Sequence, residues 1–181
     1  MTREEAYKLV CKYLDNKNLI KHSLAVEIAM KHLARKLSKS EEEWGLAGLL
    51  HDLDYATTDI SNHGKVAYEV LGEYDLSDEI LNAIIRHPGR KDEMPQTAMD
   101  YALYSVDPLT GLIVASALMH PDKKIKSLDS EFVLRRFDEK RFASGANREQ
   151  IKACENIDLK LDEFVTITLE AMKEIDNELG L

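Results

Sequence analysis

The stretch "GLLHDLDYATTDISNHG" (residues 48–64) leads from an apolar run into a His-Asp pair. The apolar run extends back to Trp44 and is typical of a buried helix, so His51 and Asp52 follow directly on interior residues. The next residues, "DYATTDIS", lose helical periodicity and predict a loop, after which a second histidine follows at His63. Because a buried carboxylate is costly unless it is paired or bound to a metal, Asp52 indicates a partner from elsewhere in the chain.

Helix signals recur on both sides of this stretch, and strand signals are nearly absent. The second helix along the chain, which carries His22, is expected over about 18–37. Pro108 lies inside a long helical region and predicts a bend near Asp107. The expected helix starts are Thr2, Asn18, Ser40, Ser61 or Asn62, Ser77, about Pro95, Asn147 and about Leu161. Together these patterns predict an all-α protein.

The composition is ordinary for a globular protein, with 44% apolar and 31% charged residues. A formal charge of -9 argues against extended nucleic-acid binding and against anionic membranes, although it is compatible with a small phosphorylated substrate. We expect no stretch to approach the apolar length that spans a bilayer. Cys11 and Cys154 fall in helical patterns and predict buried thiols in a reducing compartment. We therefore expect a cytoplasmic protein without a membrane partner, and a homo-oligomer stays open.

Helical spacing places three histidines on the buried faces of three separate helices. Each residue advances about 100° around a helix, so residues three or four apart share a face. His22 lies on the apolar stripe of its helix, His51 on the face of Trp44, and His87 on the face of Ile84. The sequence therefore predicts that these three side chains point into the interior.

The other two histidines of the helical regions are expected outside this group, His32 facing solvent and His120 in a turn. A lone inward histidine is more often a hydrogen-bonded core residue than a metal ligand. Here, however, the acids Asp52 and Asp107 both occur in apolar surroundings, and the helix of Asp52 offers no nearby lysine or arginine. Two buried acids and three inward histidines are most simply reconciled by a divalent cation.

The ordered set His22, His51-Asp52 and Asp107 resembles the H…HD…D signature of the HD-domain superfamily. The stretches "KHSLAVEIAMKHLARKL", "EEWGLAGLLHDLDY" and "YSVDPLTGLIVASAL" look like the small stand-alone HDIG-type proteins, so the resemblance covers most of the chain. It implies an all-helical, metal-dependent protein of a superfamily that consists largely of phosphohydrolases. The expected organisation is a single domain over 1–181, a helical bundle with its metal-ligand core at about 18–120 and the C-terminal helices 128–181 packed on it.

The same resemblance implies that His22, His51, Asp52 and Asp107 ligate one metal. Superfamily members with two metals add two histidines between the HD pair and the final Asp. His63 and His87 occupy that interval here, and Asp52 would then bridge two ions. His63 alone also fits an ordinary surface residue. The chain departs from the family tag, because Leu53-Asp54 stands where Ile-Gly is usual, which puts the subfamily in doubt.

Imidazole and carboxylate ligands together suit Mn, Fe, Co, Ni or Zn, as one ion or two. The expected function is a metal-dependent phosphohydrolase that cleaves a phosphoester of a small molecule, such as a nucleotide, with a metal-bound hydroxide. Asp52 is the candidate catalytic residue because it could orient the attacking water. Lys65 and Arg86 are weaker candidates for contacts with the substrate phosphate, because most such cations are simply solvated.

Two other interpretations stay open at this point. Some two-metal HD proteins have a similar ligand set but use mixed-valence di-iron to activate oxygen. Alternatively, the chain is a non-catalytic module that binds a metal or a nucleotide. Open coordination positions argue against a purely structural metal, since structural sites are normally closed.

Overall fold

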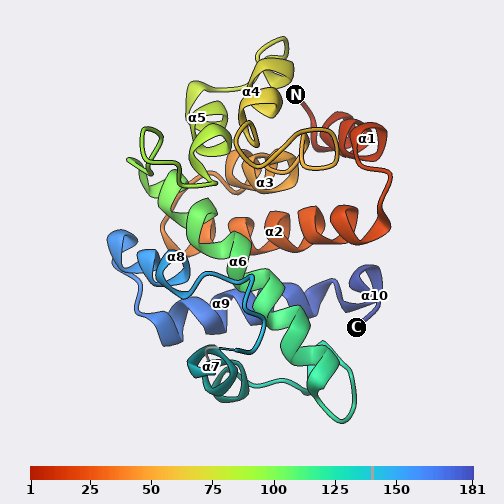
Figure 1. Ribbon diagram of the computed structural model, residues 1–181, viewed down its shortest axis with the longest axis vertical. Helices are drawn as coiled ribbons and strands as arrows, with labels where there is room; N and C mark the ends of the chain where they lie inside the picture. Colours follow the sequence, from red (N-terminus) through yellow and green to blue (C-terminus); the bar gives the residue numbers. More distant parts are fainter. Residues whose placement is uncertain (140) are drawn as a thin grey trace.

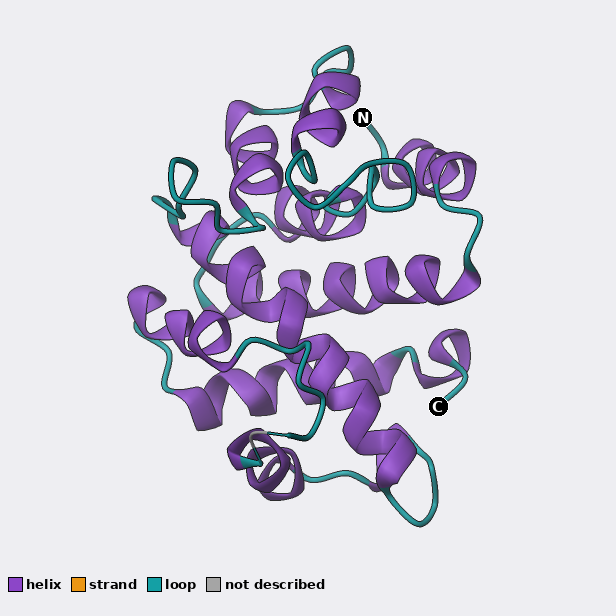
Figure 2. Ribbon diagram, in the orientation of Figure 1, coloured by secondary structure: helices purple, strands orange, loops and turns teal. Residues whose placement is uncertain are grey.

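The computed structural model describes residues 1–139 and 141–181. Over these residues the protein is all-α and contains no strand, as the sequence predicts (Figure 2). The α-helices are α1 (Arg3–Tyr13), α2 (Lys17–Lys36), α3 (Glu41–Leu50), α4 (Lys65–Leu71), α5 (Asp78–Arg86), α6 (Ala98–Met119), α7 (Ser130–Asp138), α8 (Arg148–Lys152), α9 (Leu161–Glu174) and α10 (Asp176–Leu179). Two short 3-10 helices are η1 (Ile125–Ser127) and η2 (Ala153–Ile157).

Helix α2 lies at the centre of the molecule (Figure 1). It packs against α3 on one side and α9 on the other, while α6 crosses both layers and contacts α2, α5, α8 and α9. The stripe expected to be apolar on α2 is fully buried, at Val26, Ala29 and Leu33. Three chain segments far apart in sequence therefore meet where α2, the end of α3 and the middle of α6 adjoin.

Close packing between α2 and α3 depends on Gly48. A Cβ at this position would lie 2.8 Å from the carbonyl oxygen of Val26 and 3.0 Å from the Cα atom of Glu27. Real Cβ atoms are not found so near a backbone oxygen, so only glycine allows the two helix backbones to approach this far. The contact fixes the end of α3, which carries His51, against α2 one turn after His22.

Helix α6 runs unbroken through Pro108, so the bend that the sequence predicts near Asp107 is not accompanied by an end of the helix. Buried residues on both sides of the proline, Val106 and Leu109 among them, hold the helix by tertiary packing despite the missing backbone hydrogen bond.

The expectation that no stretch approaches the length of a bilayer span is wrong, since α6 is long and apolar enough by length and composition; 56% of its most apolar window is buried, as in the core helix of a globular protein.

The start of α4 was expected at Ser61 or Asn62, and the structure begins this helix at Lys65 instead. The Asp59 carboxylate accepts hydrogen bonds from the backbone N–H groups of Ser61 and Asn62, so these residues form a capped turn. Gly64 then adopts a φ of 83°, a conformation that favours glycine. The whole segment from the end of α3 to α4 consists of turns.

The cysteines divide between surface and core. Cys154 is buried, as predicted, and burial raises the pKa of its thiol to about 11. Cys11 is exposed, so its predicted burial is wrong. Helix α1 buries the face of Ala6, Leu9 and Val10, and Cys11 lies off that face.

The last helix, which the sequence predicts from about Leu161, is divided in the structure, because α9 ends at Glu174 and α10 begins after Ile175.

Candidate metal centre

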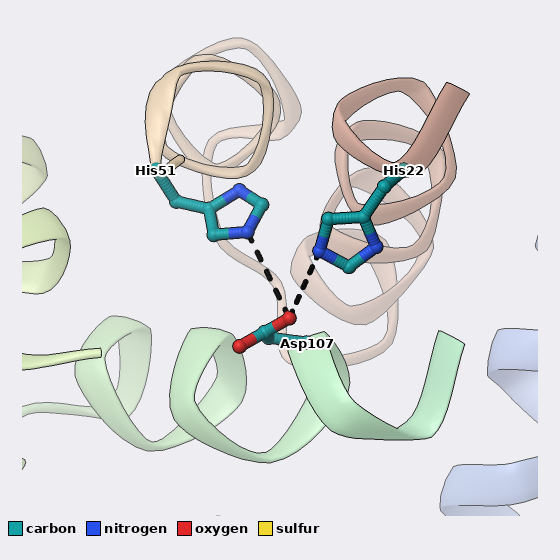
Figure 3. A group of neighbouring side chains, drawn as sticks. All are labelled: His22, His51 and Asp107. Carbon is teal, nitrogen blue, oxygen red and sulfur yellow. Dashed lines mark ion pairs between the residues drawn. The ribbon is translucent and has the colours of Figure 1, made fainter. Parts of the chain in front are cut away.

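The structure brings His22, His51 and Asp107 together from three helices. His22 comes from α2, His51 caps the end of α3, and Asp107 comes from the middle of α6 (Figure 3). The Nε2 atom of His22 lies 3.0 Å from Oδ1 of Asp107, and the Nε2 atom of His51 lies 3.8 Å from the same oxygen. One donor atom from each residue lies within 4.8 Å of the others, close enough to share one ion.

Asp52 connects this group to two further histidines. Its Oδ2 atom lies 3.5 Å from Nε2 of His22. Its Oδ1 atom lies 3.3 Å from Nε2 of His51, 3.1 Å from Nε2 of His63 and 3.6 Å from Nε2 of His87. One oxygen of Asp52 thus faces His22 and the other faces His51, His63 and His87, so the carboxylate lies where a bridging ligand would lie. Donor atoms of His51, Asp52 and His87 form a second set within 4.8 Å.

All four histidines direct the same nitrogen toward the cluster, because their Nδ1 atoms are engaged behind it. Nδ1 of His51 lies 2.8 Å from the carbonyl oxygen of Gly48, and Nδ1 of His87 lies 2.6 Å from that of Ile84. A carbonyl can only accept, so both Nδ1 atoms carry the proton. Each neutral ring therefore presents an Nε2 lone pair to the cluster.

His22 and His63 follow the same pattern with different partners. The hydroxyl of Thr110 donates to the carbonyl oxygen of Asp107 and lies 3.2 Å from Nδ1 of His22, so it accepts from that ring. Nδ1 of His63 donates to the Asp54 carboxylate at 2.8 Å. Partners of this kind fix ring orientation and tautomer in metal-binding histidines.

The donor set fits a divalent cation. Nε2 of His51 is buried and makes no hydrogen bond to any residue that the structure describes, although it faces two carboxylates. Nε2 of His63 lies 3.0 Å from Nε2 of His87, with two lone pairs aimed at each other when both rings are neutral. Lone pairs and carboxylate oxygens that converge in this way require either protons or metal ions between them.

The carboxylates make the cluster favourable for positive charge. Burial alone would lower the pKa of His51, but Asp52 and Asp107 outweigh it and raise that pKa well above its usual value. Burial would likewise lower the pKa of His63, yet hydrogen bonds to Asp52 and Asp54 raise it to about 9. For His87 burial prevails, and its pKa falls. A metal cation would take the place of these protons.

Asp54 is the residue at this site that sequence reasoning missed. From the resemblance alone, Asp54 stands only where the family has a glycine. In the structure it is 2% exposed, and its carboxylate accepts from Nδ1 of His63 and from the backbone N–H groups of Gly64 and Ala67, the latter two at 2.8 and 3.0 Å. No periodic pattern indicates this role, because the contacts of Asp54 depend on the path of the turn that brings His63 and Gly64 back to it.

His63 is held in a turn by several contacts and does not lie on the surface. It is 9% exposed, and its backbone carbonyl accepts a hydrogen bond from Arg90, which also bonds the carbonyl of Ile85. A Cβ at Gly64 would lie 3.0 Å from the carbonyl oxygen of Ile84, so the turn packs closely on the end of α5. This approach brings His63 beside His87.

The expected phosphate contacts and the remaining histidines lie outside the cluster. Arg86 donates to the buried Asp100 at 2.9 Å, so its guanidinium is already engaged in an ion pair. Lys65 begins α4 and makes no ion pair with any described residue. His32 is half-buried, 3.2 Å from Glu174, and does not face solvent as expected. His120 caps the end of α6 in the predicted turn.

The cluster is closed on one side and open on the other. The side chains of His51, His87 and Asp52 are 0%, 1% and 7% exposed, whereas those of His22 and Asp107 are 23% and 26% exposed. Solvent and small molecules therefore reach the donor atoms along the edge formed by α2 and α6. An open edge is what a catalytic metal site needs and a structural one lacks.

Fold and site together define an all-α protein whose His/Asp cluster could hold a metal ion. Residues 19–117, more than half of the chain, match the HD domain family. The chain therefore belongs to the HD domain family, as its resemblance predicted, and the cluster fits the divalent metals that HD domains bind.

Curated relatives of the chain are ribonucleases Y. The protein from Desulforudis audaxviator is 29% identical over 169 residues, which is 90% of this chain and 32% of the relative. That from Geobacter metallireducens is 28% identical over 116 residues, 63% of this chain and 22% of the relative. The chain thus spans about a fifth to a third of the relatives' length. No solved structure matches.

Proposed function

We propose that this chain is a metal-dependent phosphohydrolase that cleaves a phosphoester of a small molecule, a nucleotide or similar. The observation that carries the proposal is the convergence of histidine Nε2 lone pairs and two carboxylates at an edge open to solvent. His22, His51, Asp52 and Asp107 would hold one ion, and Asp52, His63 and His87 would hold a second. Such ions, when bound, lower the pKa of a water and offset charge on phosphoryl oxygens.

The chain's own residues have distinct roles in this proposal. Asp52 lies between His22 on one side and His51, His63 and His87 on the other, and its carboxylate can orient a water held there by accepting a hydrogen bond from it. Asp54 and Thr110 keep two of the rings in the tautomer that leaves Nε2 free. The buried side at His51 and His87 excludes water except along the open edge.

A small substrate is favoured over extended RNA by the charge of the chain. The formal charge of -9 opposes the binding of a long polyanion, which needs a basic surface. Of the two candidate phosphate contacts, Lys65 and Arg86, the arginine is already paired with Asp100. RNA is nevertheless the second candidate substrate, because the curated relatives are named ribonucleases. We also propose that the protein acts in the cytoplasm without a membrane partner.

The test is metal quantification on purified protein, followed by a panel of phosphoesters and an RNA oligonucleotide with each candidate metal restored. We expect bound transition metal and turnover of small phosphoesters, both lost in Asp52→Ala and kept in Asp15→Asn, an exposed acid outside the cluster. A metal-loaded protein that hydrolyses nothing on the panel overturns the proposal. Two irons with a mixed-valence EPR signal would assign oxygen chemistry instead, and RNA cleavage alone would reverse the choice of substrate.

A further inference from the structure

We propose that the groove between α2 and α6 is the site for the organic part of the substrate, and that it takes a largely apolar group of about nucleoside size. This inference rests on the proposed function only in that the group is attached to a phosphate. The groove has a volume of about 460 Å³. Pockets of about 300–1,000 Å³ are typical of small-molecule sites.

The groove begins at the open edge of the metal cluster. His22 belongs both to the cluster and to the wall of the groove, and Thr110, which accepts from its ring, also lines it. On α6, Gly111 and Val114 follow Asp107 at intervals of four and three residues, so they share its face. On α2, Asn18 lies one turn before His22 on the same face. A phosphate at the cluster would therefore have its ester group directed along the groove.

The chemistry of the walls favours an apolar body with one polar contact. Apolar side chains line most of the length, including Ala25, Val114 and Leu118, and Leu118 is 52% exposed although it is a leucine. Leu179 and Leu181 close the far side. A ligand that covers these side chains would remove apolar surface from water, which is the main source of affinity for such groups.

Lys21 supplies the polar contact. Its ammonium lies 2.6 Å from the carbonyl oxygen of Leu179 and forms no ion pair with any described residue. Because the group has one neutral partner and further hydrogens to donate, it can bind an oxygen of the phosphate or of the attached group. It lines the groove together with His22, its neighbour in the sequence.

Gly111 makes the groove testable. A Cβ at this position would have no described neighbour within 4 Å, so a side chain can extend from here into the groove. Glycine inside a helix also costs about 1 kcal/mol relative to alanine, so substitution should not unfold α6. Gly145 has the same open surroundings but lies outside the groove, and Gly145→Leu is the matched control.

The experiment compares 1-naphthyl phosphate, whose ring would fill the groove, with methyl phosphate, a phosphoester whose organic part is too small to reach along it. Both are used with the metal-loaded full chain, and binding of 1-naphthyl phosphate is also followed by its fluorescence. We expect Gly111→Leu to lower the ratio of kcat/KM for the two substrates, and the affinity for 1-naphthyl phosphate, by about 10-fold or more, since a buried ring contributes at least that much. We expect Lys21→Met to weaken the binding of 1-naphthyl phosphate. We expect Gly145→Leu to change neither this binding nor the ratio of kcat/KM.

The outcomes separate the groove from the proposed reaction. If Gly111→Leu binds 1-naphthyl phosphate more weakly than the wild type, and the wild type hydrolyses neither compound, the groove is supported and the proposed phosphohydrolase activity is overturned. Equal binding and an equal ratio in wild type and in a folded, metal-loaded Gly111→Leu overturn the groove, whatever the turnover. A wild type that does not bind 1-naphthyl phosphate overturns it as well.

Discussion

The two halves of the candidate metal centre are built differently. The half with His22 and Asp107 is carried by the long helices α2 and α6, and its side chains are partly exposed. The half with His63 and His87 is carried by a turn and by the end of a short helix, and it is buried. Asp52 belongs to both. The long helices place donors where substrate can arrive, whereas the turn closes the other side.

The difference also shows in what holds each ring. In the open half a neutral hydroxyl, that of Thr110, accepts from His22. In the closed half a buried carboxylate, that of Asp54, accepts from His63. A charged acceptor forms the stronger hydrogen bond and raises the basicity of the ring more. We therefore expect the closed half to depend more on its supporting residue than the open half does.

The largest effect is expected at the residue that joins the halves. Asp52→Ala removes the carboxylate shared by His22, His51 and the closed half, so both ions should be lost together. Loss of a supporting residue costs about 10–100-fold in metal affinity, and loss of a bridging ligand should exceed that range. Metal content by mass spectrometry checks this; retention of two tightly bound ions would show that Asp52 is not the bridge.

The next largest effect concerns the helix contact behind the open half. Gly48→Ala places a methyl group 2.8 Å from the carbonyl oxygen of Val26, and overpacking of this kind lowers the free energy of unfolding by about 1–3 kcal/mol. Gly111→Ala is the matched control, because its methyl group enters open space and should raise stability by up to about 1 kcal/mol. Urea denaturation measures both, and changes of the same sign would contradict the close α2–α3 approach.

A smaller and more selective effect is expected at Asp54. Asp54→Asn replaces the acceptor for Nδ1 of His63, so the affinity for the ion in the closed half should fall about 10–100-fold while the ion at His22 stays. Titration with Mn²⁺ or Zn²⁺ should then show one tight site. Asp59→Asn alters the same turn without touching an imidazole, and it should keep both ions. Equal loss in the two variants would mean that Asp54 only holds the turn.

The smallest effect is expected at Thr110. Thr110→Val removes the acceptor for Nδ1 of His22, and the neutral character of this hydrogen bond limits the expected loss of affinity in the open half to about 10-fold. Thr110→Ser keeps the hydroxyl and should bind metal as the wild type does. A larger loss at Thr110 than at Asp54 would reverse the comparison between the halves.

The sequence predicts the ligands carried by helices better than the ligand carried by the turn, His63, for a physical reason. A helix repeats its geometry, so spacing alone indicates that His22, His51 and His87 point inward. The path of a turn depends on individual contacts, such as those of Asp59 and Gly64, so the start of α4 and the position of His63 could not be predicted by periodicity.

Tertiary context decides other features as well. Pro108 removes a backbone hydrogen bond from α6, and packing on both sides keeps the helix continuous. Asp54 has no meaning in a helical pattern until the turn folds back and brings His63 to it. The groove depends on Gly111 of α6 facing α2, and a lone glycine in an apolar helix does not reveal that.

Anomalous diffraction from crystals grown with Mn²⁺ tests most directly whether these imidazoles and carboxylates converge because cations lie between them. The account predicts two anomalous peaks, one within bonding distance of His22, His51, Asp52 and Asp107, the other within bonding distance of Asp52, His63 and His87. Crystals grown at saturating Mn²⁺ that show no peak at either position, so that only protons join the histidines to the carboxylates, would contradict this prediction.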